Sequence, residues 1–216
     1  MGREDGFRPP ERTNAVREPE KEAAYVVVEI GAGEEPLPAA LGLTNSYRRR
    51  IHDNPNMQYV ALDSDPERLR SGQNYLASMD RIRRFDPNER IRFELQEGEN
   101  LRFESGSVAE IVLRNVLGDM DVEEHTKKTI IAEAARVLKP GGTLKIIEQI
   151  SPLARPEVLA LVAASSGGVF VSAESNTISE EDRKFDEEIL ELKLHPFAFV
   201  LRLQRKPLDA GQVQNV

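Results

Sequence analysis

The chain has 216 residues, a net charge of −8 and no cysteine. That length suits one α/β domain with a full hydrophobic core, and no apolar run of about 18 residues indicates a membrane span. The lack of cysteine excludes disulfides and thiolate metal sites and fits the reducing cytoplasm, where we expect the protein, while the acidic balance argues against a broad nucleic-acid surface.

Three segments differ in composition. Residues 1–23 are rich in Arg, Glu and Pro and contain almost no large apolar side chains, so we predict a charged tail that is disordered or loosely docked. Residues 24–207 alternate strand and helix patterns, which is typical of a parallel sheet with crossover helices. They form the predicted domain, and residues 208–216 form a predicted flexible C-terminal tail.

The hydrophobic pattern predicts the elements of this domain in chain order. Residues 25–28 are a continuous apolar run at the start of the segment 25–30, which indicates a central strand covered on both faces. Residues 90–96 alternate instead, which indicates a strand nearer the edge. In this half of the chain we predict strands at 25–30, 57–63 and 90–96, and helices at 36–50 and 66–79.

The second half continues the alternation. Asp121–Glu124 looks like a capping box at the start of a helix, with Asp119 in the preceding turn, and Lys139–Gly142 ends that helix. Strands are predicted at 108–114 and 143–149, a short helix within 155–165, a further strand at 168–173, and an antiparallel hairpin of 189–194 with 197–204.

A glycine turn follows the first strand. Glu29, Gly31 and Gly33 form an acidic-x-Gly-x-Gly sequence at the carboxyl end of a strand, where open α/β sheets bind cofactors against bare backbone. Glu34 and Glu35 begin the next helix, where they would repel a pyrophosphate. A cofactor with a sulfonium and an ammonium is not repelled, so on charge S-adenosylmethionine (SAM) fits better than NAD. The alternative is an ordinary connecting turn.

An acidic residue ends the second strand. Asp63 can accept both hydroxyls of a ribose that lies across the first two strands. The alternative is that this side chain only caps the next helix. We assign the cap to Asp65 and the ligand role to Asp63, with Ser64 beside it.

Two further segments complete a pattern. One is Gln96–Ser107, between the third and fourth strands, and the other is Ala135–Gly142, before the fifth. With the glycine turn and Asp63, in this order, they resemble the class I SAM-dependent methyltransferases over residues 24–205. The resemblance implies an α/β fold: a Rossmann-like three-layer sandwich with a mostly parallel seven-stranded sheet and an antiparallel C-terminal hairpin.

In that family the glycine turn holds the methionine part of SAM, the acid that ends strand two holds the ribose, and an acid in the next loop meets the adenine. This sequence has Gln96, Gly98 and Arg102 where the family usually has glycine, alanine and proline, and Glu97 where it has aspartate. The cofactor-binding residues implied are Glu29, Gly31, Ala32, Gly33, Asp63, Ser64, Glu97, Gly98 and Asn115.

The sequence does not identify a catalytic residue. Asn115, after the fourth strand, could orient an acceptor, line the cofactor pocket or hold its own loop. The segment lacks the Asn/Asp-Pro-Pro-aromatic motif of enzymes that methylate base nitrogens. His125 could act as a base, although exposed helix histidines are commoner. We place His52 past the end of the first helix, at the opposite edge of the sheet, and expect it to take no part, and we interpret His195 as structural. The histidines show no metal-ligand spacing, so we expect no metal.

Arginine clusters at 48–50 and 81–84 close two predicted helices, where the macrodipole favours cations, and we prefer that explanation to a nucleic-acid site. Little structure is added to the core, and the small polar segments 163–168 and 175–177 suit a flap over the site. We therefore expect metal-independent in-line transfer of a methyl group to a small molecule or an exposed peptide end. The alternatives are a non-catalytic SAM-binding partner subunit and a methyltransferase acting on RNA or protein.

Overall fold

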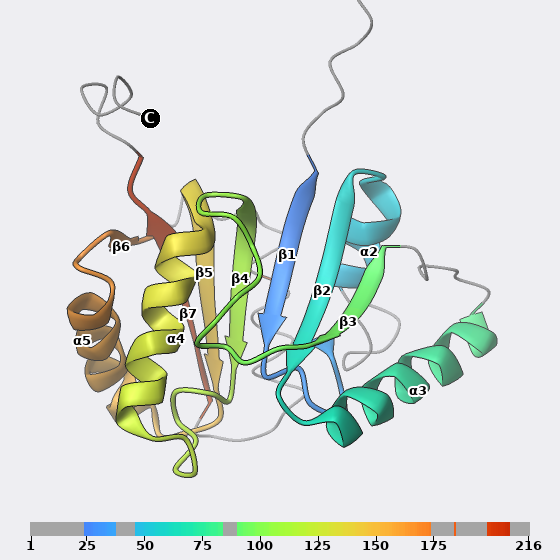
Figure 1. Cartoon of the computed structure of the whole chain (residues 1–216), viewed down its shortest axis with the longest axis horizontal. Helices are drawn as coiled ribbons and strands as arrows, with labels where there is room; N and C mark the ends of the chain where they lie inside the picture. Colours follow the sequence, from blue (N-terminus) through green and yellow to red (C-terminus); the bar gives the residue numbers. More distant parts are fainter. Residues whose placement is uncertain (1–23, 38–45, 84–89, 174–183, 185–197, 208–216) are drawn as a thin grey trace, which may run out of the picture.

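The computed structural model describes residues 24–37, 46–83, 90–173, 184 and 198–207. They form a seven-stranded sheet in the order β3-β2-β1-β4-β5-β7-β6, with helices on both faces (Figure 1). The strands are β1 (Tyr25–Ile30), β2 (Met57–Asp63), β3 (Ile91–Leu95), β4 (Val108–Arg114), β5 (Leu138–Glu148), β6 (Phe170–Ser172) and β7 (Phe199–Arg205). The helices are α2 (Ser46–Asp53), α3 (Pro66–Arg83), α4 (Glu124–Val137), α5 (Arg155–Ser165) and the 3₁₀ turn η2 (Pro152–Ala154).

The strands β1 to β5 pair in parallel, whereas β7 is antiparallel to both β5 and β6. Strand β1 lies between β2 and β4, so the strand order reverses at β1 and β4. The carboxyl ends of β1 and β4 meet at the lower edge of the sheet in Figure 1. Open α/β sheets bind their ligands at such a switch point. The predicted Rossmann-like sandwich with antiparallel C-terminal strands is confirmed.

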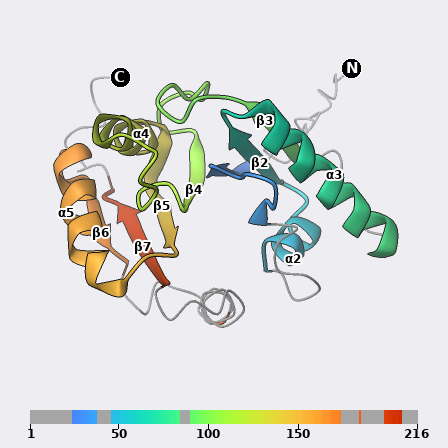
Figure 2. The same ribbon diagram turned by 90° about the horizontal axis from the view of Figure 1, so that it is seen from below.

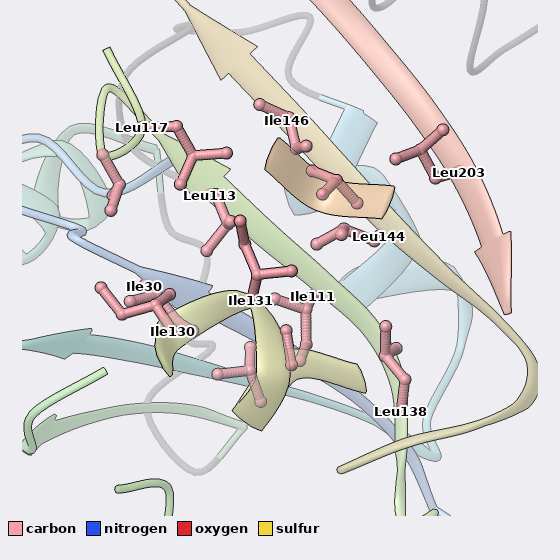
Figure 3. Packing of buried hydrophobic residues seen from close by; sticks show 14 of the residues in the cluster. Ile30, Ile111, Leu113, Leu117, Ile130, Ile131, Leu138, Leu144, Ile146 and Leu203 are labelled. Atoms are coloured by element: carbon pink, nitrogen blue, oxygen red, sulfur yellow. The ribbon is translucent and has the colours of Figure 1, made fainter. Parts of the chain in front are cut away.

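Side chains that alternate along the strands build two cores. Figure 3 shows the core under α4 and α5, in which Ile30 and Leu113 of the sheet pack near Ile131 of α4. The opposite face packs against α2 and α3, which lie on the other side of the sheet in Figure 2. Val27 and Val28 are adjacent in β1, face opposite cores and are both fully buried. The prediction of a doubly covered strand from the apolar run is therefore confirmed.

Several predicted boundaries need correction. Helix α3 extends to Arg83, beyond the predicted end near Met79, and α2 extends to Asp53. His52 therefore lies inside the last turn of α2, not past its end. Residues 38–45, in the first part of the helix predicted at 36–50, lie outside the described residues.

The start of α4 also differs from the prediction. Its N-cap is Glu123, whose side chain makes no capping hydrogen bond, so the capping box predicted at Asp121 is wrong. Asp119 does hold the preceding turn, because its Oδ1 accepts a hydrogen bond from the Asp121 N–H at 2.9 Å.

The end of α4 runs directly into β5. The register passes from Val108–Leu138 to Glu110–Thr143, so the Lys139–Gly142 segment bulges out of the strand that we predicted to begin at Thr143. Gly141 has φ of 77°, a left-handed conformation that glycine adopts without strain. The segment still ends the helix, as expected.

At the far edge, β6 pairs with β7 in the position predicted for residues 189–194. Those residues lie outside the described part of the chain, as do His195, both predicted tails and segment 175–177. Among the described residues, the antiparallel C-terminal pair joins two segments about thirty residues apart.

Candidate functional site

A cavity of about 220 Å³ lies at the carboxyl ends of β1, β2 and β4. Five of the predicted site residues line it: Gly31, Asp63, Ser64, Glu97 and Asn115. The volume is below the usual range of about 300–1,000 Å³ for ligand pockets, so a ligand as large as SAM would fill it and extend into its open mouth. Glu29, Ala32, Gly33 and Gly98 do not line it.

The glycine turn keeps its backbone close to the loop that follows β4. Gly31 has φ of 74°, and a Cβ added there would lie 2.8 Å from Val116 Cγ2. Gly33 has φ of 60° but would meet nothing within 4 Å. The Gly31 and Ala32 amides both donate to the Leu62 carbonyl, at 3.0 and 2.9 Å, which ties the turn to the end of β2. Gly31 is thus required by both conformation and space.

Asp63 links the turn to the start of α3. Its Oδ2 accepts a hydrogen bond from the Gly33 N–H at 2.8 Å, and its Oδ1 accepts one from the Asp65 N–H at 2.9 Å. Each carboxylate oxygen has two lone pairs, so each keeps one acceptor site for a ligand. Asp65 Oδ1 accepts from the Glu67 and Arg68 amides at 2.8 and 3.3 Å, so the prediction that Asp65 caps α3 is confirmed.

Glu29 faces the α2 and α3 side of the sheet and supports the turn from within the protein. Its Oε2 accepts hydrogen bonds from the Leu37 N–H at 2.9 Å and the Tyr59 hydroxyl at 2.8 Å. Its Oε1 lies 3.1 Å from Arg114 Nε. Burial raises the pKa of the Glu29 carboxyl, and the Arg114 guanidinium opposes that rise. Glu29 therefore fixes the turn without bordering the cavity.

Arg114 has no predicted role, yet it is central to this site. This residue ends β4, lines the cavity and has a side chain that is 11% exposed. Its Nη2 donates to the Ala32 carbonyl at 2.8 Å and also to the Glu35 carbonyl. Arg114 therefore clamps the glycine turn to β4.

Asn115 has the conformation that its position demands. It has φ of 54°, and within the described chain it is the non-glycine residue with positive φ, a conformation that asparagine tolerates better than most residues. Its Oδ1 accepts from the Gln149 N–H at 3.0 Å, and its N–H donates to the Ile147 carbonyl at 2.9 Å. Of the roles left open for Asn115, the structure shows that it holds its loop against β5 and lines the cavity.

Glu148, at the end of β5, holds the same loop. Its buried carboxylate accepts hydrogen bonds from the amides of Val116, Leu117 and Gly118 at 3.2, 2.8 and 3.1 Å. Burial raises the pKa of the Glu148 carboxyl, and the three N–H donors oppose that rise. A Cβ on Gly118 would lie 2.8 Å from Glu148 Oε2, so a larger residue there would have to displace the carboxylate that holds the loop.

The predicted adenine loop is held by the residues that depart from the family pattern. Gln96 Oε1 accepts a hydrogen bond from the Arg102 N–H at 3.0 Å, which closes the loop. A Cβ on Gly98 would lie 3.0 Å from Ile30 Cγ2 and 3.1 Å from Ile130 Cγ1, so the backbone packs directly on the core. Glu97 is exposed and lines the cavity.

The charges around the cavity differ from those predicted. Glu34 and Glu35, on which the argument against a pyrophosphate depended, are exposed and do not line it. Four other carboxylates and two arginines line it: Asp63, Glu97, Glu99, Asp119, Arg68 and Arg114. The cavity lining therefore carries more negative than positive charge, which favours a cationic ligand. This charge comes from the lining residues and not from Glu34 and Glu35.

The remaining candidates do not line this cavity. His125 has a 77% exposed side chain whose Nδ1 lies 3.0 Å from Glu123, and His52 lies in α2 with a 69% exposed side chain. Arg50 is paired with buried Glu110 at 2.7 Å and Arg48 is buried, so two of the three arginines of that cluster face inward. No described helix could span a bilayer, and no described group of His, Cys, Asp or Glu is arranged to hold a metal ion.

Residues 41–142 match the family model of a methyltransferase domain, and no curated protein matches the chain. Among solved structures, the [4+2]-cyclase SpnF is 16% identical with a TM-score of 0.54, covering 87% of this chain and 77% of its own. A putative sarcosine dimethylglycine methyltransferase from Galdieria sulphuraria is 13% identical, with a TM-score of 0.52 and coverage of 86% and 79%.

A putative methyltransferase from Bacillus halodurans is also 13% identical, with a TM-score of 0.52 and coverage of 86% and 94%. The family match indicates a methyltransferase domain over residues 41–142, and these solved structures show that the chain shares their fold.

Proposed function

We propose that this protein binds SAM across the carboxyl ends of β1, β2 and β4 and transfers its methyl group to a small molecule by in-line displacement, without a metal. The observation that carries the proposal is Asp63. Its carboxylate is fixed by two backbone N–H groups, borders the cavity and keeps an acceptor site on each oxygen for the two ribose hydroxyls.

The other cofactor residues follow from the same placement. Gly31 lets a ligand lie against the main chain, and Ser64 borders the cavity beside Asp63. Glu97 lines the far side, where its carboxylate can accept from an adenine amino group. Ala32, Gly33, Gly98 and Glu29 act through the backbone shape that they give to the two loops.

Bound SAM would supply a methyl group already activated on a sulfonium, so the protein's main task is alignment. Asn115 and Glu148 fix the loop after β4 beside that position, which orients an acceptor. Asp119 borders the cavity and is the carboxylate of this loop that could receive a proton from an acceptor. The inward-facing arginines of α2 support a small acceptor over a nucleic acid.

A second candidate is a SAM-binding subunit that acts with a partner. It is favoured by one similar solved structure, the complex between the Haloferax volcanii Trm112 methyltransferase activator and the putative methyltransferase. That structure is 17% identical to this chain and has a TM-score of 0.51. This candidate predicts SAM binding without turnover until the partner is added.

Calorimetric titration with S-adenosylhomocysteine (SAH) tests the main proposal, with NAD as the control ligand. We expect SAH to bind and NAD not to bind. Asp63→Ala should weaken SAH binding about 10- to 100-fold, because it removes charged acceptors for two hydroxyls. Asp65→Ala is the matched control: it removes the α3 cap and should leave SAH affinity within about threefold. Absence of heat with millimolar SAH would contradict the proposal.

A further inference from the structure

Arg114 has one more donor group than its contacts within the protein use. Its Nε is paired with Glu29 at 3.1 Å, and its Nη2 donates to the carbonyls of Ala32 and Glu35. Nη1 has no partner among the described residues and does not belong to the buried polar atoms that lack one. The guanidinium therefore offers two N–H donors at the junction of the glycine turn and the cavity.

Arg114 lies where one end of an elongated ligand would be if that ligand spans the cavity from β2 to β4. Asp63 and Ser64 border the cavity at the end of β2, and Arg114 borders it at the end of β4. β1 lies between these two strands. A ligand whose ribose lies at Asp63 and whose amino-acid part follows the glycine turn would bring its α-carboxylate toward Arg114.

The charge balance supports the same assignment. Four carboxylates line the cavity, so a ligand carboxylate would be repelled everywhere except beside a cation. Arg68 lies on α3, 3.8 Å from Asp65, and is 62% exposed, whereas Arg114 is largely enclosed. The Glu29 carboxylate offsets the charge of Arg114, so the guanidinium can donate hydrogen bonds without strongly repelling a nearby sulfonium.

We propose that Arg114 binds the α-carboxylate of the cofactor's amino-acid part and so makes the site selective for adenosyl ligands that carry it. This inference rests on the proposed function and adds the residue that distinguishes one end of the ligand. Arg114 would therefore have two roles: it clamps the glycine turn through Nη2 and binds ligand through Nη1.

The test compares two ligands on several variants by calorimetry. The ligands are SAH and its decarboxylated analogue, which keeps the adenosine, the sulfur and the amino group. Wild-type protein should prefer SAH by about 10- to 100-fold, the range expected for a charge-assisted hydrogen bond. Arg114→Gln should reduce that preference below about threefold, and Arg114→Lys should keep part of it.

Two controls separate binding from folding. Glu29→Gln with Arg114→Gln removes both members of the buried pair, so it keeps the test valid if Arg114→Gln alone does not fold. Arg68→Gln removes the other arginine of the cavity and should leave the ratio of the two affinities unchanged.

The outcomes are distinct. Equal affinity of the wild type for both ligands overturns this inference while leaving the proposed function intact. A preference that survives undiminished in Arg114→Gln, or is lost in Arg68→Gln, also overturns it. Failure of the wild type to bind either ligand contradicts the proposed function itself.

Discussion

Glu29 and Asp63 lie at the carboxyl ends of neighbouring strands, yet the two carboxylates have different surroundings. Glu29 lies on the face of β1 that packs against α2 and α3, where burial and Arg114 enclose it. Asp63 is the last residue of β2 and reaches the open edge of the sheet, where it borders the cavity. The face and the position along the strand therefore decide which acid supports the turn and which can contact a ligand.

The two glycines of the turn should respond differently to alanine. Gly31→Ala combines a positive φ with a Cβ 2.8 Å from Val116 Cγ2, so we expect the free energy of unfolding to fall by about 2–4 kcal/mol. Gly33→Ala has the same conformational cost without a close contact and should lose about 1–2 kcal/mol. Urea unfolding measures both, and equal losses would contradict the close approach at Gly31.

Glu110 should contribute stability that depends on pH. Burial would raise the pKa of its carboxyl, but the Arg50 guanidinium at 2.7 Å and the Tyr47 hydroxyl lower it from 4.5 to about 2. The folded chain therefore binds this proton more weakly than the unfolded chain. The stabilisation is present above pH 4.5 and is lost as the pH falls toward 2, and its size is about 3 kcal/mol.

Urea unfolding between pH 7 and pH 2 measures this contribution. Glu110→Gln should lower the free energy of unfolding at pH 7 by about 3 kcal/mol and flatten its decline between pH 4.5 and pH 2. Glu157→Gln, on the exposed face of α5, is the control and should keep the wild-type pH profile. A Glu110→Gln profile parallel to that of the wild type would show that the Arg50 pair does not set this dependence.

The sequence could indicate Asp63 and Gly31 but not Arg114. Asp63 and Gly31 belong to short local patterns. Asp63 is an acid at the end of a strand, and Gly31 is part of a glycine turn that follows a strand. Arg114 acts through carbonyls 82 and 79 residues away, in a turn of another strand, and no spacing in the sequence shows that contact. The same reason hides Glu148, whose amide donors lie about thirty residues earlier.

At the scale of elements, buried strands were predicted more accurately than helix ends. β1, β2 and β4 have the predicted limits because each is a predominantly apolar segment that lies almost wholly in the core. The start of α4 differs from the prediction because capping depends on which side chain reaches the free amides, and Glu123 occupies the N-cap without bonding them. The predicted partner of β7, residues 189–194, lies outside the described residues, and the described neighbours of β7 are β5 and β6, a pairing that no turn signal in the sequence indicates.

The loop after β4 should depend on the carboxylate of Glu148. Glu148→Ala leaves three amide groups without their acceptor, so we expect a loss of about 2 kcal/mol or more in stability. Amide hydrogen exchange at residues 116–118 should become faster. Gln149→Ala changes the adjacent side chain and should leave both measurements near wild-type values. Unchanged exchange in Glu148→Ala would show that other contacts hold the loop.

At the scale of the whole molecule, the alternation of strand and helix patterns was enough to predict the layers and the parallel sheet. The strand order follows from two physical rules, namely right-handed crossovers and a switch point after β1. The cavity arises from that order, because the carboxyl ends of β1, β2 and β4 come together only when β4 pairs with β1.

One sheet joins all these elements, so the domain should unfold as a unit and respond to ligand as a unit. With SAH at 100 times its Kd, linkage adds about 2.7 kcal/mol, which raises the Tm by about 5–10 °C for a chain of this length. Calorimetry should show one transition that shifts as a whole. Two transitions, with only one moved by SAH, would contradict a single domain, and an equal shift with NAD would contradict selective binding.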